Sequence, residues 1–256
     1  MRNICLVLEY DGTNFNGFQK QPNENVKTIQ GEIEKAIKAV TGNEANIFGS
    51  GRTDTGVSSE EQYANFFTAS NIEPEKLKFA LNTKLPPQIS INKSFEVPMT
   101  FHSRHSAIKR TYRYRILNSA VRSALRRNSV FQFKEKLDFE AMEEAWLSLH
   151  GVHDFDAFCK SNTDRVVMTC HIFNTECYIE DDELIFIITA DTFLRGMVRL
   201  LIGTLIFIGK GKLKPTDLME IIENKPQDRS RFSFSAGAEG LSLIKIDYHP
   251  SALLMP

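Results

Sequence analysis

Two absences narrow the functions open to this 256-residue chain. No run of apolar residues is long enough to cross a bilayer, since the most apolar segment, 193–208, is short and contains Arg195 and Arg199. No glycine-rich fingerprint of a dinucleotide-binding or phosphate-binding loop is present either. We therefore expect a chain with no membrane contact and no bound nucleotide cofactor.

Cysteine is scarce and irregularly spaced, and no CxxC pair occurs. The four cysteines are Cys5, Cys159, Cys170 and Cys177. A zinc site can be imagined with His150, His153 and His171, but the spacings match no standard ligand pattern, so buried or inert thiols are favoured and no metal is expected. No secretion signal precedes the first apolar run. We expect a cytoplasmic protein with reduced thiols.

Acidic residues are missing from residues 97–134, although the whole chain has a net charge of only −1. The basic residues of this acid-free segment are Arg104, Lys109, Arg110, Arg113, Arg115, Arg122, Arg126, Arg127 and Lys134. Tyr112 and Tyr114 lie among them. Basic side chains bind the phosphates of RNA, and aromatic rings stack on its bases, so this combination suits RNA binding. The alternative is a solvated face whose countercharges lie elsewhere in the fold.

Apolar periodicity predicts an α+β fold built from two halves. In the first half the expected order is strand, helix, strand, strand, helix, strand, at 4–10, 28–40, 46–50, 62–67, 73–81 and 89–97. A long polar loop, 11–27, follows the first strand. This is the order of a split βαβ unit, as in RNA-recognition domains.

The second half is expected to begin near Phe101 and to repeat this theme. Its strands are predicted at 107–117, near Val130, and at 167–179, 184–189 and 241–248, with a hairpin through the basic segment and helices at 139–149, 192–208 and 216–222. We expect two domains, 1–100 and 101–256. The halves would share one mixed, mostly antiparallel sheet, with an active-site cleft between them.

Residues 49–56, G-S-G-R-T-D-T-G, are the most informative stretch. Three glycines let the backbone turn sharply and approach a ligand closely. Arg52 and Asp54 lie between them, two positions apart. A carboxylate on such a turn, beside a guanidinium, is expected to be ionised and available as a nucleophile or base.

This stretch resembles the G-R-T-D-A-G-V-H signature of the tRNA pseudouridine synthase A family. Other segments match that family in the same order: E-Y-D-G at 9–12 with Phe15, Gly17, Gln19 and Gln21; F-H-S-R at 101–104; R-T-Y-R-Y at 110–114; H-D-F at 153–155; M-V-R at 197–199 with Gly203; and A-E-G-L at 238–241. The similarity spans nearly the whole chain. It implies the two-half fold, a homodimer, and a cofactor-free isomerase that converts uridine to pseudouridine in the anticodon stem-loop of tRNA, around nucleotide positions 38 to 40.

The resemblance also implies roles for individual residues. Asp54 is the nucleophile, attacking either the sugar or the uracil ring. Arg52 holds Asp54 or bonds the RNA backbone beside the flipped nucleotide. Tyr112 stacks on the base, and its hydroxyl is a candidate relay for the proton of C5. Arg199 lies in the catalytic cleft, where it meets Asp54 or a phosphate, although a structural ion pair is its alternative reading.

The basic stretch from Arg104 to Arg127, with Arg104 and Arg110 as candidate substrate-binding residues, is expected to follow the RNA stem through its phosphates. For Tyr114 core packing is expected, and for His102 an interior or surface role.

This chain departs from the family pattern in places. Ser58 and Ser59 replace the usual His and Ala after the signature, Thr55 replaces Ala, and Phe18 replaces Trp. Such changes bear on the choice of substrate more than on the chemistry. Two further readings stay open: a non-catalytic RNA-binding or tRNA-folding protein on the same scaffold, and a small-molecule enzyme that uses Asp54 as its nucleophile.

Overall fold

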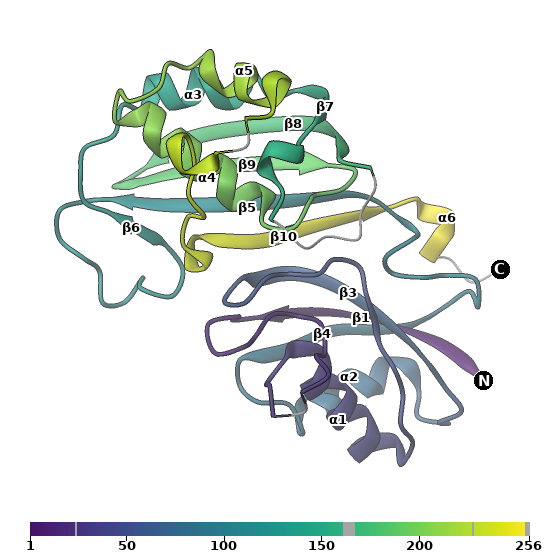
Figure 1. Ribbon diagram of the computed structural model, residues 1–256. Coiled ribbons are helices and arrows are strands. Elements are labelled where there is room, and N and C mark those ends of the chain that lie inside the picture. The colour runs from purple at the N-terminus through teal and green to yellow at the C-terminus, as the bar shows by residue number, and fades with distance from the viewer. Residues whose placement is uncertain (24, 161–166, 227, 254–256) are drawn as a thin grey trace. The chain divides into compact units, whose positions relative to one another are not determined.

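The computed structural model describes residues 1–23, 25–160, 167–226 and 228–253 (Figure 1). The chain forms two compact units: unit 1 is Met1–Arg110 with Ser242–Pro256, and unit 2 is Thr111–Leu241. The chain thus leaves unit 1 partway along one strand and returns to it for its last strand. The division into domains at residue 100 stays a prediction.

Unit 1 is an α+β structure, as predicted. Its elements are β1 (Arg2–Tyr10), α1 (Ile29–Thr41), β2 (Phe48–Gly49), β3 (Ser58–Thr68), α2 (Pro74–Asn82), β4 (Ile89–Val97), β10 (Leu241–Tyr248) and α6 (Pro250–Leu253). The first six follow the predicted order of a split βαβ unit. β1 lies between β4 and β3 and is antiparallel to both.

The outer edge of β3 is shared by two strands. β2 pairs with it antiparallel, with Phe48 opposite Asn65. β10 pairs with it in parallel, with Ser242 opposite Ser58 and Leu243 opposite Ser59. The segment that carries the G-R-T-D sequence leaves β2 and enters β3, so both of its ends are fixed to the same sheet.

Alternation along β1 explains the two faces of this sheet. Ile4, Leu6 and Leu8 lie in the core with the apolar stripe of α1, whereas Cys5 packs with Val97 on the opposite face. Figure 1 shows α1 and α2 on the same side of these strands. α1 begins at a good N-cap, because the Thr28 hydroxyl accepts a hydrogen bond from the backbone N–H of Gly31 at 3.2 Å.

β2 is shorter than predicted, two residues instead of 46–50. The reason lies in the polar side chains of α1. Glu34 Oε1 accepts a hydrogen bond from the Ile47 N–H at 3.2 Å, and Gln30 Nε2 donates to the Ile47 carbonyl at 3.4 Å. The backbone before Phe48 therefore bonds to a helix and not to a strand.

Unit 2 is also α+β. Its elements are β5 (Ala107–Asn118), β6 (Phe131–Phe133), α3 (Phe139–Leu147), β7 (Gly151–Asp154), β8 (Thr169–Glu180), β9 (Glu183–Ala190), α4 (Met197–Gly209) and α5 (Asp217–Asn224), with single turns of 3₁₀ helix at Asp156–Phe158, Arg229–Arg231 and Ala238–Gly240. The strand order is β5-β9-β8-β7, with β6 beside β5. With unit 1 this makes ten strands and six α-helices in the described part of the chain, mixed and mostly antiparallel.

Two predictions in unit 2 are wrong. The basic segment does not form a hairpin, because β6 runs parallel to β5, with Ile116 opposite Phe131. Parallel neighbours need a crossover of about a dozen residues, which is what the basic segment supplies. The helix expected from residue 192 begins only at Met197, because Gly196 has a left-handed backbone with φ of 72°. Such a residue cannot lie within a right-handed helix.

Trp146 anchors the core of unit 2. Its ring is fully buried and lies edge-on to Phe186 at 5.5 Å between centroids. Its indole N–H is shared between the carbonyls of Glu176 and Ile187, both at 3.1 Å, so its one polar atom is satisfied. α3 is thereby fixed onto β8 and β9. Among the described residues, the helices all fall short of the length and apolarity that a membrane span needs.

Candidate active site

The G-R-T-D loop, residues 49–56, is tied down by polar side chains of unit 1. The N–H of Ser50 donates to the Tyr63 carbonyl at 2.9 Å, and Gln62 Nε2 donates to the Gly51 carbonyl at 2.9 Å. The hydroxyls of Tyr10 and Thr53 are 2.9 Å apart. Burial raises the pKa of Tyr10 to about 12, so this phenol stays neutral. Sequence reasoning missed these supports, although a buried glutamine within a strand is an unusual residue that points to them.

A second loop, residues 11–18, packs against the first. The Phe18 N–H donates to the Thr53 carbonyl at 3.1 Å, and the Gly56 N–H donates to the Phe15 carbonyl at 3.3 Å. Two glycines allow this approach: a Cβ on Gly12 would lie 2.1 Å from the Val57 carbonyl oxygen, and Gly17 has φ of +84°. The E-Y-D-G segment and the G-R-T-D segment thus form one structure.

We expect Gly12→Ala to displace the loop that carries Asp54. An added methyl group cannot occupy the space of a backbone carbonyl, so the two loops must separate, at a cost of about 1–3 kcal/mol in the free energy of unfolding. The Gly12→Ala variant should lose much more activity than the Gly42→Ala control, because only the first displaces Asp54. Gly42→Ala is the control, because its left-handed φ of +76° costs about 1 kcal/mol while its Cβ meets open space. Urea unfolding and an assay of activity check both variants; equal activities would contradict the expectation.

Asp54 begins a tight turn. Its carbonyl accepts a hydrogen bond from the Val57 N–H at 3.1 Å, and Gly56, at the third position, has φ of +79°. This is the conformation that a type II turn requires of its third residue, which is why glycine follows two positions after the aspartate. The side chain of Asp54 is half-buried. The turn therefore presents the carboxylate from a fixed backbone.

Arg52 and Arg104 are brought together on the surface of unit 1. Both side chains are exposed. Partial burial and the nearby charge of Arg104 lower the pKa of Arg52. Within the part of the chain that the structure describes, Arg52 forms no ion pair. Two neighbouring guanidiniums repel unless an anion lies between them, so this pair is suited to binding an anion.

Arg110 holds this arrangement together. Its Nη2 donates to the carbonyls of Arg104 at 2.8 Å and Ser50 at 3.2 Å, and its Nη1 donates to the Ala107 carbonyl at 3.2 Å. One guanidinium thus links the start of the G-R-T-D loop to the loop that carries Arg104. The sequence does not reveal this role, because carbonyl acceptors leave no mark in the residue pattern.

The two remaining candidate residues belong to unit 2. Tyr112 is buried, with its ring edge-on to that of Phe193 at 5.0 Å between centroids. Arg199 is half-buried on α4, and its Nε donates to the Ala236 carbonyl at 2.6 Å. Tyr114 is fully buried and its hydroxyl donates to the Gly237 carbonyl at 2.8 Å, which confirms the expected core position.

Three of the four residues that depart from the family pattern have structural roles here. Ser58 Oγ accepts from the Gly12 N–H at 3.1 Å, and the buried Ser59 hydroxyl donates to the Leu243 carbonyl of β10 at 3.0 Å. The Phe18 ring fills the space above Gly49, where an added Cβ would lie 2.3 Å from it. These side chains support the loop that carries Asp54.

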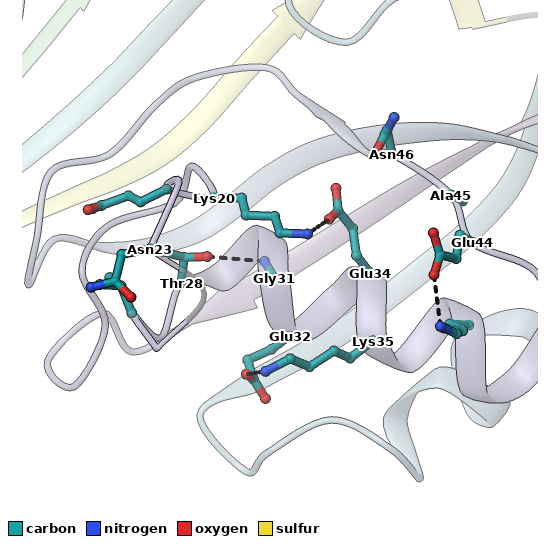
Figure 2. A pocket seen from close by; sticks show the side chains of 13 residues that line it. Lys20, Asn23, Thr28, Gly31, Glu32, Glu34, Lys35, Glu44, Ala45 and Asn46 are labelled. Carbon is teal, nitrogen blue, oxygen red and sulfur yellow. Dashed lines mark hydrogen bonds and ion pairs between the residues drawn. The ribbon is translucent and has the colours of Figure 1, made fainter.

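A pocket of about 400 Å³ lies between α1 and the loop before it (Figure 2). Its charged residues pair with one another: Lys20 with Glu34 at 3.6 Å, Lys35 with Glu32 at 2.9 Å and Lys38 with Glu44 at 2.8 Å. The candidate site residues are not among those that line it. Because its charges are already neutralised, we do not place the substrate there.

Comparisons with known proteins identify the family of the chain. The family model described as "tRNA pseudouridine synthase" matches residues 6–106 and 145–249. "tRNA pseudouridine synthase A" of Caldicellulosiruptor bescii is 44% identical over 97% of this chain and 100% of its own length. The proteins of the same name from Acetivibrio thermocellus, 43% identical, and Clostridium acetobutylicum, 42% identical, are covered equally well. The chain belongs to the tRNA pseudouridine synthase family.

Proposed function

We propose that this protein isomerises uridine to pseudouridine in the anticodon stem-loop of tRNA, around nucleotide positions 38 to 40, with Asp54 as its nucleophile. As a member of its family the chain is an isomerase. The observation that carries the role of Asp54 is its presentation: a half-buried carboxylate on a glycine-containing turn, in a loop that is hydrogen-bonded to the loop 11–18 and to β3. A preorganised side chain of this kind loses little freedom when it reacts.

The reaction breaks the N1–C1′ bond, turns the uracil ring, and forms a C5–C1′ bond. The proton of C5 leaves, N1 gains a proton, and no atom or electron is added from outside. A nucleophile, a support for the detached base and a base for the C5 proton therefore suffice. Asp54 supplies the first, by attack on either the sugar or the ring.

In this proposal Tyr112 supports the detached base and accepts the proton of C5. Its ring stacks on the uracil, and its hydroxyl relays the C5 proton. Arg199 bonds a phosphate or Asp54. The proposal requires these residues of unit 2 to act on the nucleotide that Asp54 attacks.

Arg52 and Arg104 contact the RNA backbone beside the flipped nucleotide, and Arg110 contributes to substrate binding by holding the carbonyl of Arg104. Extruding a uridine costs a few kcal/mol, and least where stacking is already weak, as in an anticodon arm. The protein acts as a homodimer in the cytoplasm, as the family resemblance implies.

Mapping of pseudouridine on bulk tRNA tests the proposal. Incubation of unmodified tRNA with the protein should give new pseudouridine at one or more sites of the anticodon arm. Pseudouridine elsewhere in the tRNA would keep the chemistry and overturn the specificity. Intact binding without any pseudouridine would favour the RNA-binding alternative.

We expect Arg104→Gln to weaken tRNA binding evenly across sequences and to lower the slope of log K against log salt by about one, because one phosphate contact is lost. Lys93→Gln, an exposed change on β4, is the control and should leave the slope unchanged. Filter binding at several salt concentrations gives both slopes. An unchanged slope for Arg104→Gln would place this guanidinium outside the RNA contact.

A further inference from the structure

A row of aromatic rings lies on the surface of unit 1 beside Arg104, whose charge also acts on Arg52. The rings of Phe48 and His102 are 4.9 Å apart between centroids, and those of His102 and His105 are 4.3 Å apart. Phe48 is 37% exposed and His105 is exposed, so both ends of the row are accessible. We call Phe48, His102 and His105 the ring row. The Phe48 ring also lies edge-on to that of Phe67, at 6.4 Å between centroids.

The loop that carries the two histidines is fixed from below by buried amides. Asn65 Oδ1 accepts hydrogen bonds from the N–H of Ser103 at 2.9 Å and from its hydroxyl at 2.8 Å. Asn65 Nδ2 donates to Asn3 Oδ1 at 2.9 Å, and Asn3 Nδ2 donates to the Phe101 carbonyl at 3.0 Å. Both asparagines are fully buried in strands. Buried amides at these positions serve to hold the loop in one conformation.

Further hydrogen bonds hold the same loop, residues 101–107. The Tyr248 hydroxyl donates to the Ser103 carbonyl at 2.7 Å, and Arg110 donates to the carbonyls of Arg104 and Ala107. The Ser106 N–H donates to the His102 carbonyl at 2.9 Å. A loop held by this many hydrogen bonds is already ordered before a ligand arrives, which reduces the entropy lost on binding.

The charged groups that act on His102 are basic residues. The N–H of Arg104 donates to His102 Nδ1 at 3.1 Å, which requires that nitrogen to be an acceptor. Partial burial, followed by the neighbouring His105 and Arg104, lowers the pKa of His102. The charged groups that act on His102 and Arg52 are therefore all basic. A flat ring with cations beside it fits a nucleobase and its phosphate.

We propose that the ring row stacks an unpaired base next to the target uridine, while Arg104 and Arg52 hold the phosphate attached to it. This inference rests on the proposed function, because it takes tRNA as the ligand. It adds the ring row as a stacking surface beyond the one that Tyr112 provides. Arg52 lies two residues from Asp54, so the stacked base flanks the one that reacts.

His105→Ala and Phe48→Ala test the ring row. Each should raise the KM for tRNA about tenfold, since one stacking contact is lost, and leave the single-turnover rate at saturating enzyme unchanged. His105→Tyr should restore the KM because it restores a ring. Phe79→Ala is the matched control: Phe79 is an exposed ring on α2 with a lysine over it, 67% exposed, and outside the ring row.

A fluorescent probe locates the stacked base. With 2-aminopurine placed in turn at the unpaired positions of an anticodon-arm RNA, one position should be quenched by the wild-type protein and not by His105→Ala. Wild-type KM values for both ring-row variants, with no change in quenching, would overturn the inference. If the wild-type protein makes no pseudouridine at all, the proposed function fails; if it does so while the variants match it, only the ring row fails.

Discussion

Asp54→Asn should abolish pseudouridine formation, with a loss of roughly 10⁴-fold or more, and leave tRNA binding intact. Removing a nucleophile costs far more than removing a contact, because no other group takes its place in the reaction. Asparagine has nearly the shape of aspartate, and the turn at Asp54 is made by its carbonyl and by Gly56. The loop should therefore keep its conformation. Single-turnover assays with saturating enzyme, together with gel-shift binding, measure the two effects separately.

Asp247→Asn is the matched control for this change. Its carboxylate, also in unit 1, pairs with Lys245 at 2.7 Å and has no assigned part in the chemistry. That variant should form pseudouridine at the wild-type rate. If Asp54→Asn kept full activity, Asp54 would lose its role as nucleophile. If neither the wild-type protein nor the variant made pseudouridine while both bound tRNA, a binding protein on this scaffold would be the better description.

Tyr112→Phe should bind tRNA normally and release the proton of C5 about 10²- to 10⁴-fold more slowly, the range typical for a lost general acid or base. The ring stays in place to stack on the base and to contact Phe193. Only the hydroxyl is lost. Release of tritium from tRNA labelled at uridine C5 measures this step directly.

Tyr114→Phe is the control on the same strand. Its hydroxyl bonds the Gly237 carbonyl, so the variant should lose about 1 kcal/mol of stability and little activity. Tyr112→Ala should lose binding as well as proton release, because the ring is gone too. If Tyr112→Phe released tritium at the wild-type rate, Tyr112 would keep only its stacking role, and another group would have to accept the proton of C5.

The order of elements in unit 1 was predictable because each element carries its own pattern. α1 has apolar residues at Ile29, Ile33 and Ile37, three to four positions apart, and all three are buried. β1 is a nearly continuous buried run, as a strand packed on both faces should be. The local sequence also predicted the turn that begins at Asp54, because Gly56, which the turn requires, follows two positions later.

Pairing between distant strands was not predictable from the pattern. β6 has a strand-like sequence, but nothing local shows that it joins β5 in parallel. The start of α4 depended on the backbone of Gly196, and a glycine in an otherwise apolar stretch does not reveal its φ angle. Such features depend on the folded context rather than on neighbouring residues.

The candidate site shows the same division. The motif made Asp54 and Arg52 candidate residues, because both are read directly from the sequence, and their roles stay predictions. The sequence does not reveal that Arg110 holds Arg104, because the acceptor is a carbonyl group that any residue carries. It also does not reveal that Asn3 and Asn65 hold residues 101–106, because those side chains lie more than 35 positions away along the chain. Whether Tyr112 and Arg199 reach the same nucleotide as Asp54 stays a prediction.

The parallel pairing of β10 with β3 has a consequence for the order in which the protein is made. Ser59 and Leu243 are bonded across 184 positions of chain. The ribosome therefore completes all of unit 2 before it supplies the strand that covers the edge of β3 beside the G-R-T-D loop. A nascent chain stopped before Ser242 leaves that edge exposed to other strands. The unit that holds Asp54 begins first during translation and is finished last.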